Sequence, residues 1–223
     1  MADLKKSFIW GLPKWSVLFC DGTYYHPGRT FMSIKSKAVV IRETGLPSPY
    51  AQSRPLSVED VTLLPPEATE VVVKVAGGGL CHSDLSVING SRPRPMPMVL
   101  GHEGSGEIVE LGSAVRDLRV GDHVVFQFSA SCGRCRSCLE GRPQICSTHR
   151  EAGAKNELMG GGSRIRDHEG NVLGHHTGVS CFSEYAVVDR GSIVVVDKSI
   201  PLSDAALFGC AVMTGMGAVT NTA

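Results

Sequence analysis

Four cysteines placed close together have the clearest chemistry in this chain. They lie in the segment SCGRCRSCLEGRPQIC with the spacing Cys-x2-Cys-x2-Cys-x7-Cys, and they are Cys132, Cys135, Cys138 and Cys146. Zn²⁺ takes four thiolates in a tetrahedron at about 2.3 Å, and two-residue gaps let a tight turn direct successive sulfurs to one centre. Gly133, Gly141 and Pro143 are expected to break any helix here, so the segment is predicted to be a loop. The spacing predicts a closed structural zinc site; free or disulfide-bonded cysteines are the alternative.

A second set of candidate ligands is scattered along the chain. Cys81 lies in GGGLCHSDL, His102 follows in LGHEGSGEIVELGSAV, and Cys210 lies in LFGCAVMTG. Two cysteines and a histidine leave the fourth zinc position open for a water or an alcohol, as in a catalytic site. A lone cysteine is more often a small buried apolar residue, and a lone histidine is usually a structural group. The surrounding sequence must therefore decide whether these three residues are metal ligands or ordinary structural residues.

The segment from Gly101 to Val115 resembles the signature of zinc-containing alcohol dehydrogenases, in which Gly-His-Glu is followed by glycines at fixed offsets, here Gly106 and Gly112. The resemblance extends from about Lys37 to the end of the chain. It implies a medium-chain dehydrogenase of the liver-type long form with two zinc ions per chain. Such an enzyme oxidises an alcohol to an aldehyde or ketone by hydride transfer from a zinc-bound alkoxide to NAD or NADP.

The same resemblance assigns roles near the open site. Cys81, His102 and Cys210 are the expected catalytic zinc ligands, and Glu103 is the acidic neighbour that can approach the metal. Ser83 would take the alcohol proton. Asp84 resembles the carboxylate that orients the ligand histidine. Ordinary turn or capping chemistry is the alternative for Ser83, Asp84 and Thr214.

Further positions match the cofactor and substrate surfaces of the family. His82 and Thr214 are expected to approach the cofactor, and Phe128 is expected to line the alcohol pocket. One position departs from the pattern, because Ser86 stands where liver-type members carry a histidine that completes the proton relay. A serine with a water, or His82, could substitute.

Short β-branched runs dominate the rest of the chain and predict strands separated by Gly, Pro and Asp turns. They are KAVVI, EVVVKVA, GEIVEL, DHVVFQF, FSEYAVV and SIVVVD. Short helices are expected at 82–87 and after Pro201, where Ser203 could cap a turn. The adjacent His175 and His176 are expected to lie in a polar loop. The fold class predicted is mainly β, and the resemblance narrows it to a chaperonin-10-like (GroES-like) barrel with a protruding zinc lobe.

Three parts of the chain are expected. Residues 1–31 resemble nothing in the family and are predicted to be an extension outside the fold; 32–208 form the catalytic domain, with the zinc lobe at 129–149; 209–223 begin the connection to a cofactor-binding domain. No Gly-x-Gly-x-x-Gly turn for a dinucleotide is present, so a Rossmann domain is expected to be essentially absent from this chain. Three interpretations of the chain remain open: a fragment of a longer dehydrogenase, a truncated product without turnover, or a zinc-scaffold binding module.

The composition limits the partners. Lysine plus arginine equals aspartate plus glutamate at 22 each, so no net charge favours nucleic acid or an anionic membrane. No run of about 20 apolar residues predicts a membrane span. A small alcohol or aldehyde is the expected partner, with a homo-oligomer expected only if a cofactor domain is present. Cys20 and Cys181 are most simply free thiols of a cytoplasmic protein.

Overall fold

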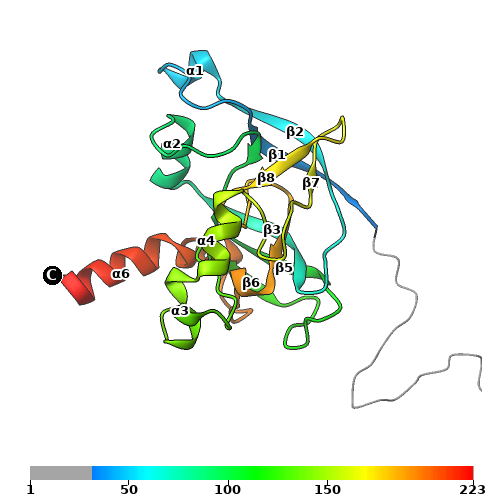
Figure 1. Ribbon diagram of the computed structural model, residues 1–223, viewed down its shortest axis with the longest axis vertical. Helices are drawn as coiled ribbons and strands as arrows, with labels where there is room; N and C mark the ends of the chain where they lie inside the picture. The colour runs from blue at the N-terminus through cyan, green and yellow to red at the C-terminus, as the bar shows by residue number, and fades with distance from the viewer. Residues whose placement is uncertain (1–31, 223) are drawn as a thin grey trace, which may run out of the picture. The chain divides into compact units, whose positions relative to one another are not determined.

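The computed structural model describes residues 32–222, which form two β-sheets with short helices around them (Figure 1). One sheet is a closed barrel in the order β1-β2-β7-β8-β4, and the other has five strands in the order β10-β6-β5-β3-β9. The barrel strands are β1 (Ile34–Ile41), β2 (Leu56–Leu63), β4 (Met98–Val99), β7 (Ile165–Arg166) and β8 (Val172–His175). Those of the second sheet are β3 (Glu70–Gly79), β5 (Glu103–Leu111), β6 (His123–Phe126), β9 (Tyr185–Asp189) and β10 (Ile193–Val195). The predicted mainly β class is confirmed, whereas the predicted extension 1–31 and Cys20 lie outside the described residues.

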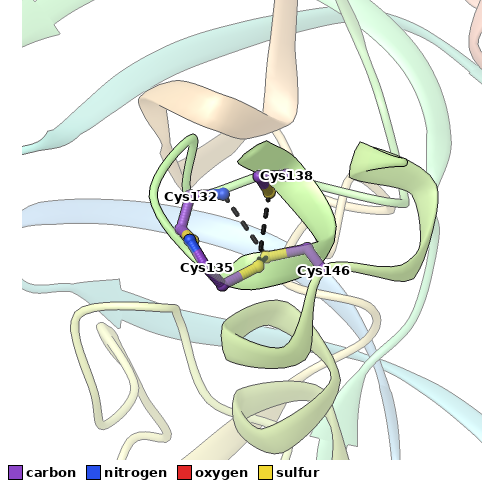
Figure 2. Close-up of side chains that lie close together, drawn as sticks. All are labelled: Cys132, Cys135, Cys138 and Cys146. Carbon is purple, nitrogen blue, oxygen red and sulfur yellow. Dashed lines mark hydrogen bonds between the residues drawn. The ribbon is translucent and has the colours of Figure 1, made fainter. Parts of the chain in front are cut away.

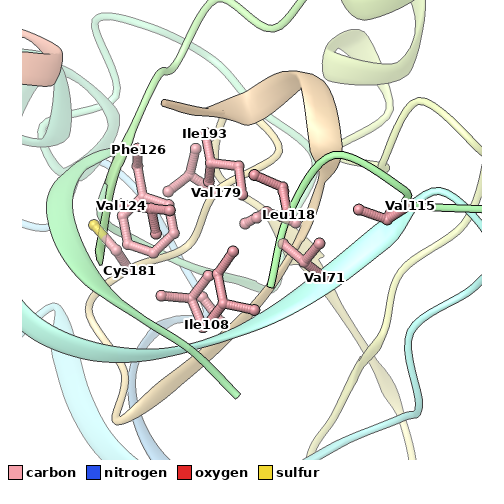
Figure 3. Close-up of a cluster of buried hydrophobic side chains, with 12 residues drawn as sticks. Val71, Ile108, Val115, Leu118, Val124, Phe126, Val179, Cys181 and Ile193 are labelled. Carbon is pink, nitrogen blue, oxygen red and sulfur yellow. The ribbon is translucent and has the colours of Figure 1, made fainter. Parts of the chain in front are cut away.

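The central strand β3 is apolar on both sides because each of its faces covers a different core. Successive side chains of a strand point to opposite faces. Val71 and Val73 therefore join one buried cluster, which also contains Ile108 and Phe126 (Figure 3). Val72 joins a second cluster with residues of the barrel. A continuous run of valines is thus explained by burial on two sides.

The helices are short and mostly lie at the ends of strands. They are α1 (Tyr50–Ser53), α2 (His82–Ile88), α3 (Arg136–Leu139), α4 (Ser147–Ala154), α5 (Leu202–Ala205) and α6 (Ala211–Thr222), with 3-10 turns at Pro143–Ile145, Arg190–Ser192 and Ala206–Gly209. Two details of the prediction are wrong. The lobe is not purely loop, because α3 fits between Gly133 and Gly141. Ser203 does not cap α5, since it lies inside that helix and its hydroxyl binds Asp204.

Signature glycines allow backbones to approach closely beside the site. A Cβ at Gly106 would collide with the carbonyl oxygen of Lys74, and one at Gly112 would collide with that of Glu67. Only glycine lets β5 pack against β3 and the preceding turn in this way. The two signature glycines therefore allow the close packing of β5, the strand that begins at Glu103.

The last described helix, α6, projects from one side of the sheets (Figure 1) and has no buried residue. Val212, Met213, Met216 and Val219 are all exposed on it. None of the described helices is long and apolar enough to cross a bilayer alone, and Leu202–Gly209 and Ala211–Thr222 reach that length and apolar content only together, as a pair bent by 50°.

Candidate metal centres

The four lobe cysteines converge on one centre (Figure 2), with their sulfurs all within 4.8 Å of one another. The Sγ of Cys135 lies 3.5 Å from that of Cys138 and 3.8 Å from that of Cys146. Four thiolates at about 2.3 Å from a tetrahedral zinc lie about 3.8 Å apart, so the spacing fits zinc. All seven described cysteines are unbonded. The donor set and its geometry fit a closed four-thiolate site.

Local hydrogen bonds prepare two of these thiols, Cys132 and Cys135, to lose their protons. The Thr148 hydroxyl donates to Cys132 at 3.4 Å and, with backbone amides, lowers the pKa of Cys132 to about 7. The backbone at Cys138 and Ser147 lowers the pKa of Cys135 to about 5. Burial and the Cys135 sulfur raise the pKa of Cys138 to about 11. A divalent cation would complete the ionisation, because thiolate is the form that binds metal.

The scattered ligand candidates also come together. Cys81, just before α2, His102, just before β5, and Cys210, just before α6, bring their ligating atoms within 4.8 Å of one another. The two sulfurs are 3.9 Å apart, which again fits a tetrahedral zinc with bonds of about 2.3 Å. Three donors leave one position for a fourth ligand. The set therefore fits a zinc ion that is open to substrate.

The two sulfurs of this set differ in acidity. Although burial alone would raise the pKa of Cys81, hydrogen bonds from Ser83 and His102 lower it. Burial and the neighbouring Cys81 sulfur instead raise the pKa of Cys210 to about 11. Without a cation, Cys81 is therefore the thiol that ionises more readily. Binding of a cation by both sulfurs requires Cys210 to lose its proton as well.

Glu103 holds the backbone next to one ligand candidate. Its buried carboxylate accepts a hydrogen bond from the backbone N–H of Ala211 at 2.9 Å. A Cβ at Gly79 would press on this side chain, so a larger residue there would have to displace Glu103. Glu103 therefore fixes the chain where Cys210 leads into α6.

Asp84 connects the other two ligand candidates. It is the third residue of α2, and its Oδ2 accepts from the backbone N–H of Cys81 at 3.2 Å in a capping box. Its Oδ1 accepts from His102 Nδ1 at 3.2 Å and from the Gly101 N–H at 3.3 Å. His102 Nε2 is thereby left for a metal. Burial alone would raise the pKa of Asp84, but the hydrogen bond from His102 and the nearby His176 imidazole bring that pKa well below its usual range.

The expectation that His175 and His176 lie in a polar loop is wrong. Both side chains are fully buried, with His175 at the end of β8. His175 Nε2 accepts from the Arg164 N–H, and burial lowers the pKa of His175 to about 3. His176 instead faces the site: its Nδ1 lies 3.1 Å from Asp84 Oδ1. The parallel pairing of β4 with β8, with Val99 opposite His175, places it there.

The remaining expected residues surround the open site. The Ser83 hydroxyl contacts the Cys81 sulfur. His82 is exposed, and its Nδ1 lies 3.3 Å from Ser86 Oγ. The serine that stands in place of the relay histidine therefore contacts another histidine. Phe128 packs edge-on against the His102 ring, with centroids 5.8 Å apart.

Thr214 lies one turn into α6 and its hydroxyl contacts the Cys210 sulfur. It is exposed, as are its neighbours on that helix. The structure therefore brings the expected residues into one region, and His176 is the neighbour that the sequence did not indicate.

Comparisons with known proteins agree with this geometry. Residues 67–198 match the family model described as the alcohol dehydrogenase GroES-like domain. The chain is 39% identical over 175 residues to an S-(hydroxymethyl)glutathione dehydrogenase of Saccharomyces cerevisiae, covering 78% of this chain and 45% of that protein. It is 38% identical over 191 residues to the Synechocystis protein of the same name, covering 85% and 49%. The chain thus spans about half the length of the curated relatives that it matches.

Solved structures show the same pattern. An alcohol dehydrogenase zinc-binding domain protein from Burkholderia ambifaria has a TM-score of 0.76 and 34% identity, over 86% of this chain and 50% of that one. Benzyl alcohol dehydrogenase from Acinetobacter calcoaceticus has a TM-score of 0.69 and 33% identity, over 84% and 48%.

Proposed function

Because this chain belongs to the alcohol dehydrogenase GroES-like domain family of zinc-dependent dehydrogenases, we propose that it is the metal-binding catalytic part of an enzyme that oxidises a small alcohol to an aldehyde or ketone with NAD or NADP. Cys81, His102 and Cys210 would hold the catalytic zinc. The four lobe cysteines would hold a structural zinc, since their donor set leaves no open position.

The observation that carries this proposal is the convergence of the three scattered donors. They lie next to three different elements and are spread over more than a hundred residues of sequence, yet their ligating atoms lie within 4.8 Å of one another. A chain that needed only a structural metal would have no use for a second, three-donor site beside a serine hydroxyl. Zinc in such a site supplies Lewis-acid chemistry, which lowers the pKa of an alcohol that reaches it.

The residues around the site would handle the proton. Ser83 presents a hydroxyl beside Cys81, where it would accept the proton of an alcohol at the open position as it gives up its own. His82 and Ser86, 3.3 Å apart, would carry that proton towards solvent, since His82 is exposed. In this proposal the pair replaces the relay histidine that is missing at Ser86.

Other side chains would orient the partners. Phe128 covers one side of the His102 ring and would form an apolar wall for the substrate. Thr214 and His82 would contact the cofactor, which supplies the hydride acceptor. The names of the relatives point to hydroxymethyl-thiol adducts and benzyl alcohol as the first substrates to test.

Metal analysis of the reduced, purified chain tests the two sites. We expect two zinc ions per chain in the wild type and one in both Cys135→Ser and His102→Ala. Cys135→Ser should also lower the melting temperature strongly, because a structural zinc contributes folding free energy directly. His102→Ala should mainly empty the open site. One zinc or none in the wild-type chain would overturn the assignment.

Activity is tested with the same variants. Ethanol, benzyl alcohol and the formaldehyde–glutathione adduct would be assayed with NAD and with NADP, using the longest natural form of the protein. Oxidation that disappears in His102→Ala but survives in a surface control, Asp60→Asn, supports the proposal. A wild-type protein with two zinc ions and no oxidation of any alcohol would favour a binding module.

A further inference from the structure

A fully buried histidine next to the open site has no role in the chemistry described so far. His176 has 0% exposure, and its Nδ1 lies 3.1 Å from Asp84 Oδ1. The N–H is poorly aligned with that oxygen, and within residues 32–222 neither ring nitrogen has a well-aligned hydrogen-bond partner. Burying such a group without a partner costs about 1–3 kcal/mol. Asp84 is the carboxylate that this ring approaches, so it is the group that can offset the cost of burying His176.

The backbone around His176 is shaped to present this side chain. The His176 N–H donates to the Ser180 hydroxyl at 2.9 Å, and that hydroxyl donates to the Val99 carbonyl at 2.8 Å. The His176 carbonyl accepts from the backbone N–H groups of Val179 and Ser180. Thr177 and Ser180 have φ values of 54° and 57°, in the left-handed region that costs non-glycine residues about 1–3 kcal/mol each. The turn accepts this strain while fixing His176 beside β4.

The two imidazoles approach Asp84 from different directions. His102 and His176 have ring centroids 5.2 Å apart and planes at 86°, and both Nδ1 atoms reach the same oxygen of Asp84. Phe128 covers the His102 ring as a further edge contact, also nearly perpendicular at 84°. His102 is therefore enclosed by its carboxylate and two ring edges. A change at His176 would remove one contact from Asp84 and one ring edge from His102.

We propose that His176 is a positioning residue whose Nδ1–H holds the Asp84 carboxylate in place, so that Asp84 in turn keeps His102 Nε2 directed at the metal. The inference rests on the proposed zinc site at Cys81, His102 and Cys210. The misaligned N–H is consistent with it, because hydrogen bonds in such sites often tighten only when the site is complete. Carboxylates that orient metal-bound histidines affect metal affinity by about 10–100-fold, and His176 acts one contact further out.

Two variants separate the N–H from the ring. His176→Phe keeps an aromatic ring against His102 and removes the donor, whereas His176→Asn keeps an amide N–H near the Nδ1 position and removes the ring. His175→Phe is the matched control, because it makes the same change at an equally buried neighbour that does not touch Asp84. The readout is the rate at which each zinc-loaded 223-residue chain loses its second zinc to a chromophoric chelator. The visible spectrum of Co²⁺ in the open site is measured alongside.

We expect His176→Phe to release the open-site metal about tenfold faster than wild type, with an altered Co²⁺ spectrum and unchanged release from the four-cysteine site. His176→Asn and His175→Phe should stay within about twofold of the wild-type rate. A rate of zinc release from His176→Phe equal to that of wild type would overturn the inference. An equal acceleration of zinc release in His175→Phe would also overturn it. If His176→Phe does not fold, accelerated release from His176→Asn overturns it and wild-type release supports it. A wild-type chain that retains only one zinc would overturn the metal site itself, which is a different result.

Discussion

The buried carboxyl of Asp189 at the end of β9 should make the stability of this domain depend on pH. It is 4% exposed, and its Oδ2 accepts from the Met159 N–H at 2.7 Å. Burial, helped by the nearby charge of Glu70, raises the pKa of Asp189 from 3.8 to about 6. The folded protein therefore holds this proton more tightly than the unfolded chain does. The contribution of Asp189 to stability is therefore fully present below about pH 4 and is lost as the pH rises through about 6.

The size of the effect follows from the difference between these pKa values. About two pKa units correspond to about 3 kcal/mol above pH 7, and to less than about 1 kcal/mol at pH 4. Asp189→Asn keeps a carbonyl oxygen for Met159 and cannot ionise. Any constant cost of the buried amide is the same at each pH. The gap in unfolding free energy should therefore move by about 2 kcal/mol in favour of the variant between pH 4 and pH 8.

Urea unfolding at several pH values, with excess zinc, measures this gap. Asp60→Asn serves as the control because that side chain is 78% exposed, and its curve should run parallel to wild type. Parallel curves for Asp189→Asn and wild type would refute the reasoning. So would a gap that favours the variant more at acid pH.

Four other outcomes are expected. Gly101→Ala should lower the unfolding free energy by more than about 1 kcal/mol in calorimetry, because φ is 94° and a Cβ would collide with the Phe182 backbone. Glu103→Leu should free the Ala211 N–H and speed zinc loss from the open site alone, measured by chelator competition. The zinc affinity of that site should rise between pH 6 and pH 9, because the Cys210 thiol, with its pKa raised to about 11, must lose a proton; equilibrium dialysis measures this. The 223-residue chain by itself should turn over alcohols far more slowly than about one per second, because it matches only about half of its relatives' length; an NADH-linked assay checks this.

The candidate ligands, whose side chains the structure brings together, could be picked out from the sequence because they lie in short motifs with fixed spacing. The same holds for the central strands, whose valine-rich runs are long enough to indicate burial. The barrel strand β2 was not predicted, because LSVEDVTL mixes acidic with apolar residues and half of its side chains face solvent. Strands β4, β7 and β8 are too short for any periodicity to show. Their existence depends on pairing with partners far away in the chain, such as Leu63 with Ile165.

His176 shows why the supporting residues of a metal centre are harder to predict than its ligands. Nothing in GHHTG indicates burial, because two adjacent histidines favour a polar loop on composition alone. Their position is decided by the parallel pairing of Met98 with Gly174 and of Val99 with His175, which carries His176 alongside the segment that leads to His102. The alternation at the end of β8 then turns His175 towards Arg164 and His176 towards Asp84. A ligand motif specifies which atoms bind the metal, whereas the fold decides which distant side chains hold those atoms in place.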